Sequence, residues 1–402
     1  MLWPGQRWHC EGSMARIGSA AADRMAAARR GVVRLRASAR ATNLMLLATL
    51  VLVFATGVGA VATGTARGRW IVIGHGVVAL MVVLLIPWKT VVVRRGLRRG
   101  RTSRWVSLLL VVMVVTTLVA GMVSVTGWVR TVGGFLTLWW HIAVALALVP
   151  LLLWHLASRP VRLRRSRPSP RPPSGSPPES SPGFAPQSSP RFSRRPAGQA
   201  RRAALRLGVI ASAAAVAYPL EEAALRLVGA PGARRRFTGS HRVASADPAA
   251  MPVTSWLDDR VPTVDLERWR LTVVDATGRR ELALSDLPDR KTTLGATLDC
   301  TSGWYADHEW TGVPVMALLT PSAGDRSLYV RSVTGYWRRF PVEDMDALLL
   351  ATAVGGEQLS RGHGSPVRLV APGRRGFWWV KWVDRIELQP TPPWWQPPFP
   401  LT

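Results

Sequence analysis

The chain has 402 residues and a formal net charge of +28. Such a charge is common in nucleic-acid-binding proteins, where basic residues cover a folded face together with aromatic residues. Here the basic residues gather in segments beside apolar runs, so the sequence argues against nucleic acid as a partner. Lys and Arg in such places are typical of membrane proteins, because they are retained on the cytoplasmic side.

The first part of the chain predicts a membrane bundle. Residues 1–40 are rich in Arg and Ala and have no apolar core for a secretory signal, so they are expected to form a basic cytoplasmic tail. Four apolar runs follow, at residues 44–63, 70–88, 105–129 and 131–156. Each approaches or exceeds the roughly 20 residues that a helix needs to cross about 30 Å of hydrocarbon. The basic segment at residues 89–104 is placed inside by its charge. Residues 41–158 are therefore expected to form a four-helix transmembrane bundle with both ends in the cytoplasm.

The next two segments connect this bundle to the rest of the chain. Residues 159–202 are rich in Pro, Arg and Ser, and such a composition predicts a disordered cytoplasmic linker. Residues 203–229 are weakly apolar and predict a fifth membrane helix. The pair Arg201-Arg202 before it resembles a twin-arginine export signal, although ordinary positive-inside charge explains it equally well. Both interpretations place the following domain outside the cytoplasmic membrane of a bacterium.

Residues 245–390 are expected to form an α+β domain. Alternating β-branched residues predict strands at residues 269–274 and 328–333, and residues 342–352 predict a short helix. Gly and Pro separate the elements. The tail at residues 391–402 is rich in Pro and Trp and is expected to pack on the surface as extended chain.

Two sequence blocks in this domain carry chemistry. Cys300 is the domain's one cysteine, since Cys10 lies in the basic N-terminal segment. A lone thiolate is a soft metal ligand or a nucleophile. The first block reads Leu298-Asp299-Cys300-Thr301-Ser302-Gly303-Trp304, and the second reads His363-Gly364-Ser365-Pro366-Val367-Arg368, followed by Val380-Lys381-Trp382. Together they resemble the molybdopterin-dependent oxidoreductase domain of the sulfite oxidase superfamily.

The resemblance implies a cofactor and a set of site residues. In this family the molybdenum is bound by two sulfurs of the pterin dithiolene and by one protein thiolate, which here would be Cys300. His363, Arg368 and Lys381 match the positions that hold the pterin and its phosphate. Thr334 matches another cofactor contact with looser spacing. His308 matches no position in the family pattern and is expected to be an exposed loop histidine.

The same resemblance indicates the reaction. Trp304 lies four positions after the cysteine, and this Cys-x-x-x-Trp spacing resembles the bacterial methionine-sulfoxide-reductase branch of the family. Sulfite oxidases instead carry an Arg soon after the cysteine. We therefore expect a two-electron oxygen-atom transfer that reduces a small sulfoxide-like oxo substrate. A sulfite-type oxidase and a non-catalytic surface module with a degenerate pterin fold remain alternatives.

Two histidines of the predicted bundle indicate a second cofactor. His75 and His141 lie near the outer ends of the second and fourth predicted helices, and two histidines at one depth can ligate a b-type haem. Ionisable residues inside membrane helices are costly and are therefore functional candidates. His155 is expected near the inner interface. The arrangement resembles four-helix cytochrome b domains, with electrons supplied by the quinone pool, and a haem-free anchor is the alternative.

Overall fold

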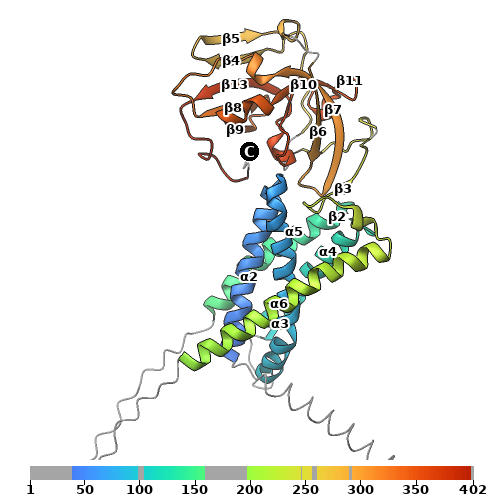
Figure 1. Ribbon diagram of the computed structural model, residues 1–402, viewed down its shortest axis with the longest axis vertical. Coiled ribbons are helices and arrows are strands. Elements are labelled where there is room, and N and C mark those ends of the chain that lie inside the picture. Colours follow the sequence, from blue (N-terminus) through green and yellow to red (C-terminus); the bar gives the residue numbers. More distant parts are fainter. Residues whose placement is uncertain are drawn as a thin grey trace, which may run out of the picture.

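The computed structural model describes residues 39–97, 104–158, 197–245, 247–255, 260–288 and 292–399. The predicted cytoplasmic tail and the predicted linker lie almost entirely outside these ranges, so both stay predictions. The described chain forms a bundle of long helices with a domain of strands at one end (Figure 1).

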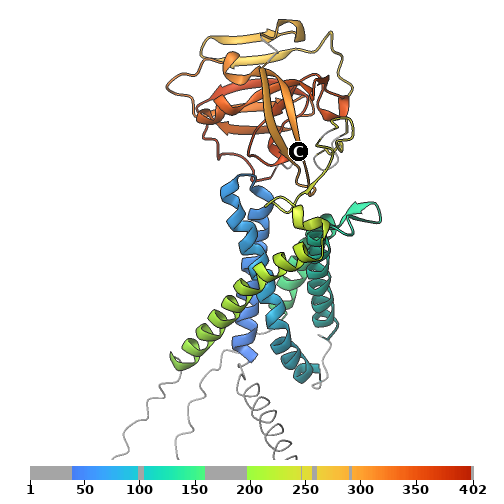
Figure 2. The same ribbon diagram turned by 45° about the vertical axis from the view of Figure 1, so that its right-hand side comes forward.

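The described part of the bundle contains five long helices. They are α2 (Ala39–Ala62), α3 (Arg69–Leu97), α4 (Arg104–Thr126), α5 (Thr137–Ala157) and α6 (Ala197–Leu227). Each includes a segment long and apolar enough to cross a membrane. The helix α2 packs against α3, α4 packs against α5, and α6 runs obliquely along α3 (Figure 2). The number of helices agrees with the predicted four-helix bundle and its additional fifth helix.

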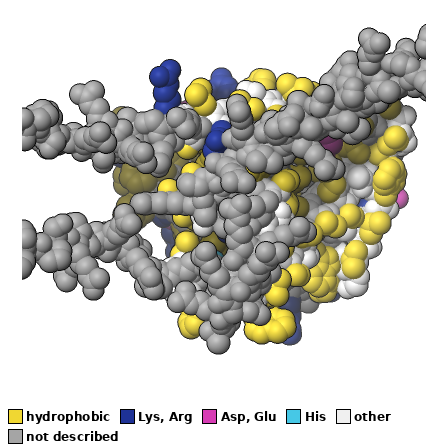
Figure 3. Space-filling model, turned by 90° about the horizontal axis from the view of Figure 1, so that it is seen from below, with side chains coloured by type: hydrophobic (Ala, Val, Ile, Leu, Met, Phe, Trp, Pro, Cys, Tyr) yellow, Lys and Arg dark blue, Asp and Glu magenta, His cyan; other side chains and the backbone are white. Residues whose placement is uncertain are grey.

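The bundle exposes many apolar side chains. A small core forms where Met45, Val78, Leu85 and Ile210 pack together. By contrast, the outward side chains of α4 and α5 are highly exposed, as in Val112 (58%), Leu146 (56%) and Leu153 (60%). Hydrophobic side chains also cover much of the surface that the grey atoms leave visible in the view from below (Figure 3). Such an outer surface is costly in water and is compatible with lipid.

The connection between α4 and α5 differs from the prediction. The apolar runs at residues 105–129 and 131–156 predicted two helices separated by a single residue in the sequence. In the structure a short hairpin of β1 (Thr131–Val132) and β2 (Phe135–Leu136) separates them. Gly127 has a φ of +71° directly after α4, a conformation that ends helices. Gly133 and Gly134 have φ values of +59° and +82°, as a tight hairpin requires.

The domain of strands contains two sheets that share one hydrophobic core. The first sheet has the order β11-β10-β7-β3, with β6 also paired to β7 and β12 to β10. Its strands are β3 (His241–Arg242), β6 (Thr292–Asp299), β7 (Trp304–Pro314), β10 (Leu349–Val354), β11 (Glu357–Gln358) and β12 (Arg368–Val370). The second sheet has the order β5-β4-β13-β8-β9. Its strands are β4 (Leu271–Asp275), β5 (Gly278–Leu282), β8 (Ser327–Ser332), β9 (Trp337–Pro341) and β13 (Val383–Gln389).

The two predicted strands are confirmed as β4 and β8, but the predicted helix at residues 342–352 is wrong. A 3-10 helix covers Val342–Ala347, and the chain then enters β10. Apolar runs this short are ambiguous, because a buried strand and a buried helix share the same composition. Pairing of β10 with both β7 and β12 favours the strand here.

The domain contacts the end of the bundle where α2 joins α3 and α4 joins α5. His241 of β3 lies 2.9 Å through its Nε2 from the backbone oxygen of Ser124 on α4. Two glycines allow close approach: a Cβ at Gly303 would lie 3.0 Å from Leu138 of α5, and one at Gly64 would lie 2.7 Å from the backbone of Arg374 and Arg375. The seam between domain and bundle is therefore closely packed.

We expect Gly64→Ala to weaken this seam. The added methyl group has no room against the Arg374–Arg375 backbone, and such overpacking typically costs about 1–3 kcal/mol. Thermal unfolding and limited proteolysis of the full chain in detergent should show a lower midpoint and faster cleavage between bundle and domain. Gly74→Ala on α3, where an added Cβ meets nothing within 4 Å, is the matched control. Equal behaviour of the two variants would contradict a closely packed seam.

Candidate active site

Cys300 lies in the tight turn that joins β6 to β7. Gly303 has a φ of +94°, and the Cys300 amide donates to the Trp304 oxygen at 2.9 Å, so the turn is short and well defined. The thiol is buried, with 8% exposure. Its Sγ lies 3.0 Å from the Ser302 hydroxyl and 3.3 Å from the Thr254 hydroxyl. Both hydroxyls are therefore within hydrogen-bonding distance of the sulfur.

Both sequence blocks meet at one cavity. A hollow of about 250 Å³ is lined by Cys300 and by residues from distant segments. All five residues predicted for the domain's site line it, namely Cys300, Thr334, His363, Arg368 and Lys381. Trp139 of the bundle helix α5 also lines the hollow, so the bundle forms part of its wall. The structure thus brings the predicted residues together, while their individual roles stay predictions.

Arg368 is a buried cation without an acidic partner. Its guanidinium lies 5.3 Å from the ring centre of Trp310 and 5.6 Å from that of Trp379. Nη1 donates to the His363 oxygen at 3.1 Å, whereas the buried Nε has no hydrogen-bond partner. No carboxylate of the described residues forms an ion pair with it. Burial lowers the pKa of Arg368 to about 10. A buried guanidinium with unused donors fits an anionic ligand such as a phosphate.

His363 and Lys381 hold the wall beside this arginine. The His363 ring lies 2.9 Å through Nε2 from the Met251 oxygen and 2.9 Å through Nδ1 from the Ser360 hydroxyl. Burial lowers the pKa of His363, so the neutral imidazole is favoured. The Lys381 ammonium donates to the Thr254 oxygen at 2.9 Å and to the Gly362 oxygen at 2.6 Å. These contacts tie residues 251–254 to the second sequence block.

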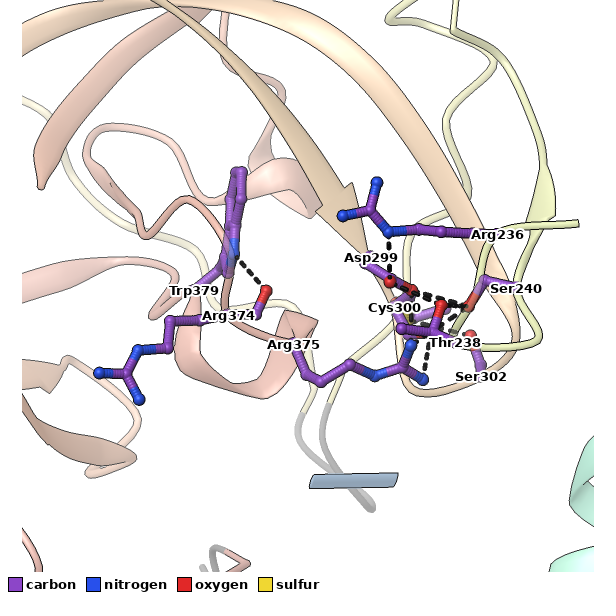
Figure 4. Close-up of polar contacts among 10 residues, drawn as sticks. Arg236, Thr238, Ser240, Asp299, Cys300, Ser302, Arg374, Arg375 and Trp379 are labelled. Carbon is purple, nitrogen blue, oxygen red and sulfur yellow. Dashed lines mark hydrogen bonds and ion pairs between the residues drawn. The ribbon is translucent and has the colours of Figure 1, made fainter. Parts of the chain in front are cut away.

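A buried ion pair below Cys300 was not predicted from the sequence. The Asp299 carboxylate accepts from Arg375 Nη1 at 2.6 Å and from the Thr238 and Ser240 hydroxyls, each at 2.7 Å (Figure 4). Asp299 and Arg375 are 1% and 2% exposed. Arg375 also donates through Nη2 to the Cys300 oxygen at 3.2 Å. The pair therefore holds the backbone of the cysteine itself. Its two residues lie 76 positions apart in the sequence, so no local pattern indicates the pair.

The prediction for His308 is wrong. This residue lies within β7 and is 9% exposed, with its ring edge-on to Trp310 at 6.3 Å. Because β7 is eleven residues long and its buried positions mostly alternate with more accessible ones, residue 308 falls on the buried face. Burial lowers the pKa of His308. It does not line the cavity around Cys300.

The structure also brings together the two predicted histidines of the bundle. His75 of α3 and His141 of α5 have ring centres 6.1 Å apart and ring planes at 86°. His75 Nδ1 lies 2.9 Å from the Val53 oxygen, and His141 Nδ1 lies 2.8 Å from the Thr117 oxygen. Gly57 and Gly121 face these rings, where a Cβ would lie within 3.0 Å. His155 lies fourteen residues further along α5, at its last turn.

Comparisons with known proteins identify the family of this domain. Residues 258–395 match a family model described as an oxidoreductase molybdopterin binding domain. Mitochondrial sulfite oxidase of Macaca fascicularis is 29% identical over 167 residues, which cover 32% of this chain and 31% of that protein. Nitrate reductase [NADPH] of Phytophthora infestans is 34% identical over 99 residues, covering 20% of this chain and 10% of that protein. The sulfane dehydrogenase SoxCD structure from Paracoccus pantotrophus is 28% identical with a TM-score of 0.31, covering 33% of this chain and 40% of that one.

The buried Cys300 thiol and the buried Arg368, which has no acidic partner among the described residues, line one cavity, and this donor set fits a metal–pterin cofactor. Residues 258–395 are a molybdopterin-binding oxidoreductase domain of the sulfite oxidase superfamily. The chain spans about a third of the length of the sulfite oxidases it matches.

We expect Asp299→Ala to destabilise the domain strongly. Removing the carboxylate leaves the Arg375 guanidinium buried without its partner, which typically costs about 3–5 kcal/mol. Chemical unfolding of the full chain should report this loss. Glu267→Ala, an exposed acidic residue of the same domain, serves as the control and should change stability by less than about 0.5 kcal/mol. Similar losses in both variants would show that the pair does not hold the turn.

Proposed function

We propose that this protein is a membrane-anchored molybdopterin oxidoreductase that transfers an oxygen atom in a two-electron reaction and reduces a neutral, sulfoxide-like substrate. The observation that carries the proposal is one cavity with two complementary features. It contains the thiol of Cys300, a soft ligand suited to molybdenum, and the Arg368 guanidinium, which lacks an anion. The sulfite oxidase and nitrate reductase relatives support this reaction class.

Each residue of the cavity has a defined task in this proposal. Cys300 would hold the metal through its thiolate, and the Ser302 and Thr254 hydroxyls would orient that sulfur. Arg368 would bind the pterin phosphate, while Trp310 and Trp379 exclude water from the guanidinium. His363, Lys381 and Thr334 would complete the pterin site. The bound molybdenum–pterin group supplies the centre for oxygen-atom transfer.

The charges around the cavity favour a neutral substrate. Among the described lining residues, the basic ones besides His363 are Arg368 and Lys381, and both are assigned to the pterin. The turn of Thr301, Ser302 and Gly303 offers no cation to an anionic substrate. This supports sulfoxide reduction over sulfite oxidation, which remains the alternative function. Substrate-dependent oxidation of a reduced electron donor indicates the first, and substrate-dependent reduction of an oxidised acceptor indicates the second.

We further propose that the bundle anchors the domain at the outer surface of a bacterial membrane. The two connections that contact the domain, α2–α3 and α4–α5, are those that the positive-inside rule assigns to the outside. The described helix α6 spans residues 203–229 of the predicted anchor almost completely. The Arg201-Arg202 pair beside it is compatible with a twin-arginine export signal or with simple insertion.

A haem between His75 and His141 is part of this proposal. Each Nδ1 lies beside a backbone oxygen and must carry the proton, which leaves each Nε2 with a free electron pair. The two ring centres are 6.1 Å apart, so His75 and His141 would hold the haem iron between them. His141 lies about one helical turn from Leu138 and Trp139, which contact the catalytic domain or its cavity. This position suits one-electron transfer from the quinone pool to the domain.

We expect Cys300→Ser to abolish turnover while the domain remains folded. A hydroxyl is a far weaker ligand for a soft metal than a thiolate. Reduction of methyl phenyl sulfoxide with a reduced viologen dye measures turnover, and thermal unfolding monitors the fold. Cys10→Ser should retain full activity. Undiminished turnover in Cys300→Ser would contradict the assignment of this thiol.

For the haem, we expect membranes containing the intact protein to show a b-type absorption spectrum after dithionite reduction. His75→Ala and His141→Ala should each remove the bands, because a low-spin haem needs both axial ligands. His155→Ala, on the same helix as His141, should leave the bands unchanged. A complete lack of such bands in the intact protein would show that the bundle is an anchor without haem.

A further inference from the structure

A second cavity lies at the seam between the bundle and the catalytic domain. It has a volume of about 180 Å³ and is lined by residues of the α4–α5 connection, of β3 and of the Cys300 turn. In the ribbon view, β3 lies beside the end of the bundle that carries β2 (Figure 1). Val129, Leu136 and Leu138 line it from the bundle, and Val243, Pro252 and Trp304 line it from the domain. We call this cavity the seam chamber.

The seam chamber shares part of its wall with the Cys300 cavity. Thr254 and Ser302, whose hydroxyls lie 3.3 Å and 3.0 Å from the Cys300 Sγ, line both hollows. Trp304 and Pro252 are also shared. On the bundle side, Leu138 lines the chamber and its neighbour Trp139 lines the Cys300 cavity. A molecule reacting beside Cys300 therefore lies next to the chamber.

The chemistry of the chamber is that of an apolar subsite. No acidic residue lines it among the described residues, and its one arginine, Arg130, has an exposed side chain. His241 already contacts the Ser124 oxygen through Nε2, and burial lowers its pKa, which favours the neutral ring. An engineered apolar cavity of about 150 Å³ binds benzene. The chamber's 180 Å³ is therefore enough for a phenyl group.

We propose that the seam chamber is a specificity subsite for the uncharged hydrocarbon substituent of the oxo substrate, with one wall supplied by the membrane bundle. This inference rests on the proposed function and defines its substrate class as neutral sulfoxides with a substituent of about phenyl size. The oxygen-bearing group lies beside Cys300, and the substituent extends past Thr254 and Ser302 into the chamber. The bundle then selects substrate in addition to anchoring the domain.

The first test compares two substrates of different size. In the full chain, Leu138→Trp fills the chamber and should raise KM for methyl phenyl sulfoxide at least about tenfold, while KM for dimethyl sulfoxide changes less than about twofold. Leu138→Ala enlarges the chamber and should shift the preference towards substituents larger than phenyl. Leu146→Trp, at an exposed position on the same helix, is the control and should leave both KM values unchanged. Equal effects of Leu138→Trp on both substrates would overturn the subsite.

The second test needs no turnover. Leu136→Cys in a Cys10→Ser background places a thiol in the chamber, and N-phenylmaleimide alkylation reports its access, with Cys10→Ser alone as the blank. Methyl phenyl sulfoxide should slow the alkylation, whereas dimethyl sulfoxide at the same concentration should not. Protection without any turnover would support the subsite and contradict the proposed reaction. If both sulfoxides are turned over but neither slows the alkylation, the subsite is overturned and the proposed reaction stays intact. The same conclusion follows if a short-chain quinone alone slows the alkylation.

Discussion

The buried ion pair between Asp299 and Arg375 is the contact on which the rest of the site depends. It joins the end of β6 to residues 238–240 and to the loop before residue 376, and Arg375 also holds the backbone oxygen of Cys300. The same loop contacts Gly64 of the bundle. One buried pair therefore fixes the position of the thiol and of the loop that meets the bundle. Loss of the Asp299 carboxylate would leave the Arg375 guanidinium uncompensated in the interior, whereas Asp299 would keep its second ion pair, with Arg236 at 3.0 Å, if Arg375 were lost.

Two of the three buried arginines of the described domain, Arg368 and Arg375, differ in whether a carboxylate pairs with them. Arg375 has a carboxylate partner at 2.6 Å, although its buried Nε, like that of Arg368, has no hydrogen-bond partner. Arg368 contacts aromatic faces and a backbone oxygen, and no carboxylate of the described residues pairs with it. Cation–π contacts give about 2 kcal/mol when desolvated, whereas burying an ion costs several kcal/mol. An anion bound in the cavity would offset the remaining cost at Arg368, which lines that cavity.

The two sequence blocks were sufficient to predict which domain residues meet at the cavity, because Cys300, His363, Arg368 and Lys381 all line it. Alternating apolar residues also predicted β4 and β8 correctly. Local patterns failed where pairing decides the outcome: residues 349–352 form part of a strand because β7 and β12 flank them, and His308 is buried because β7 continues through it. The Asp299–Arg375 pair spans 76 residues, and no local pattern indicates it. The seam depends on how the bundle and the domain dock against each other. The spacing of apolar residues along the sequence does not encode that docking.

The proposed function joins these features in one account, in which the bundle anchors the domain, supplies electrons and forms one wall of the substrate site. Its central claim is that Cys300 binds molybdenum in the cavity beside Arg368. The most direct measurement is X-ray absorption at the molybdenum edge of the purified full chain, compared with Cys300→Ser. The account predicts three sulfur ligands in the unmodified protein, two from the pterin and one from Cys300, and two in any molybdenum retained by the variant. A protein that contains no molybdenum, or a sulfur count unchanged by the substitution, would contradict it.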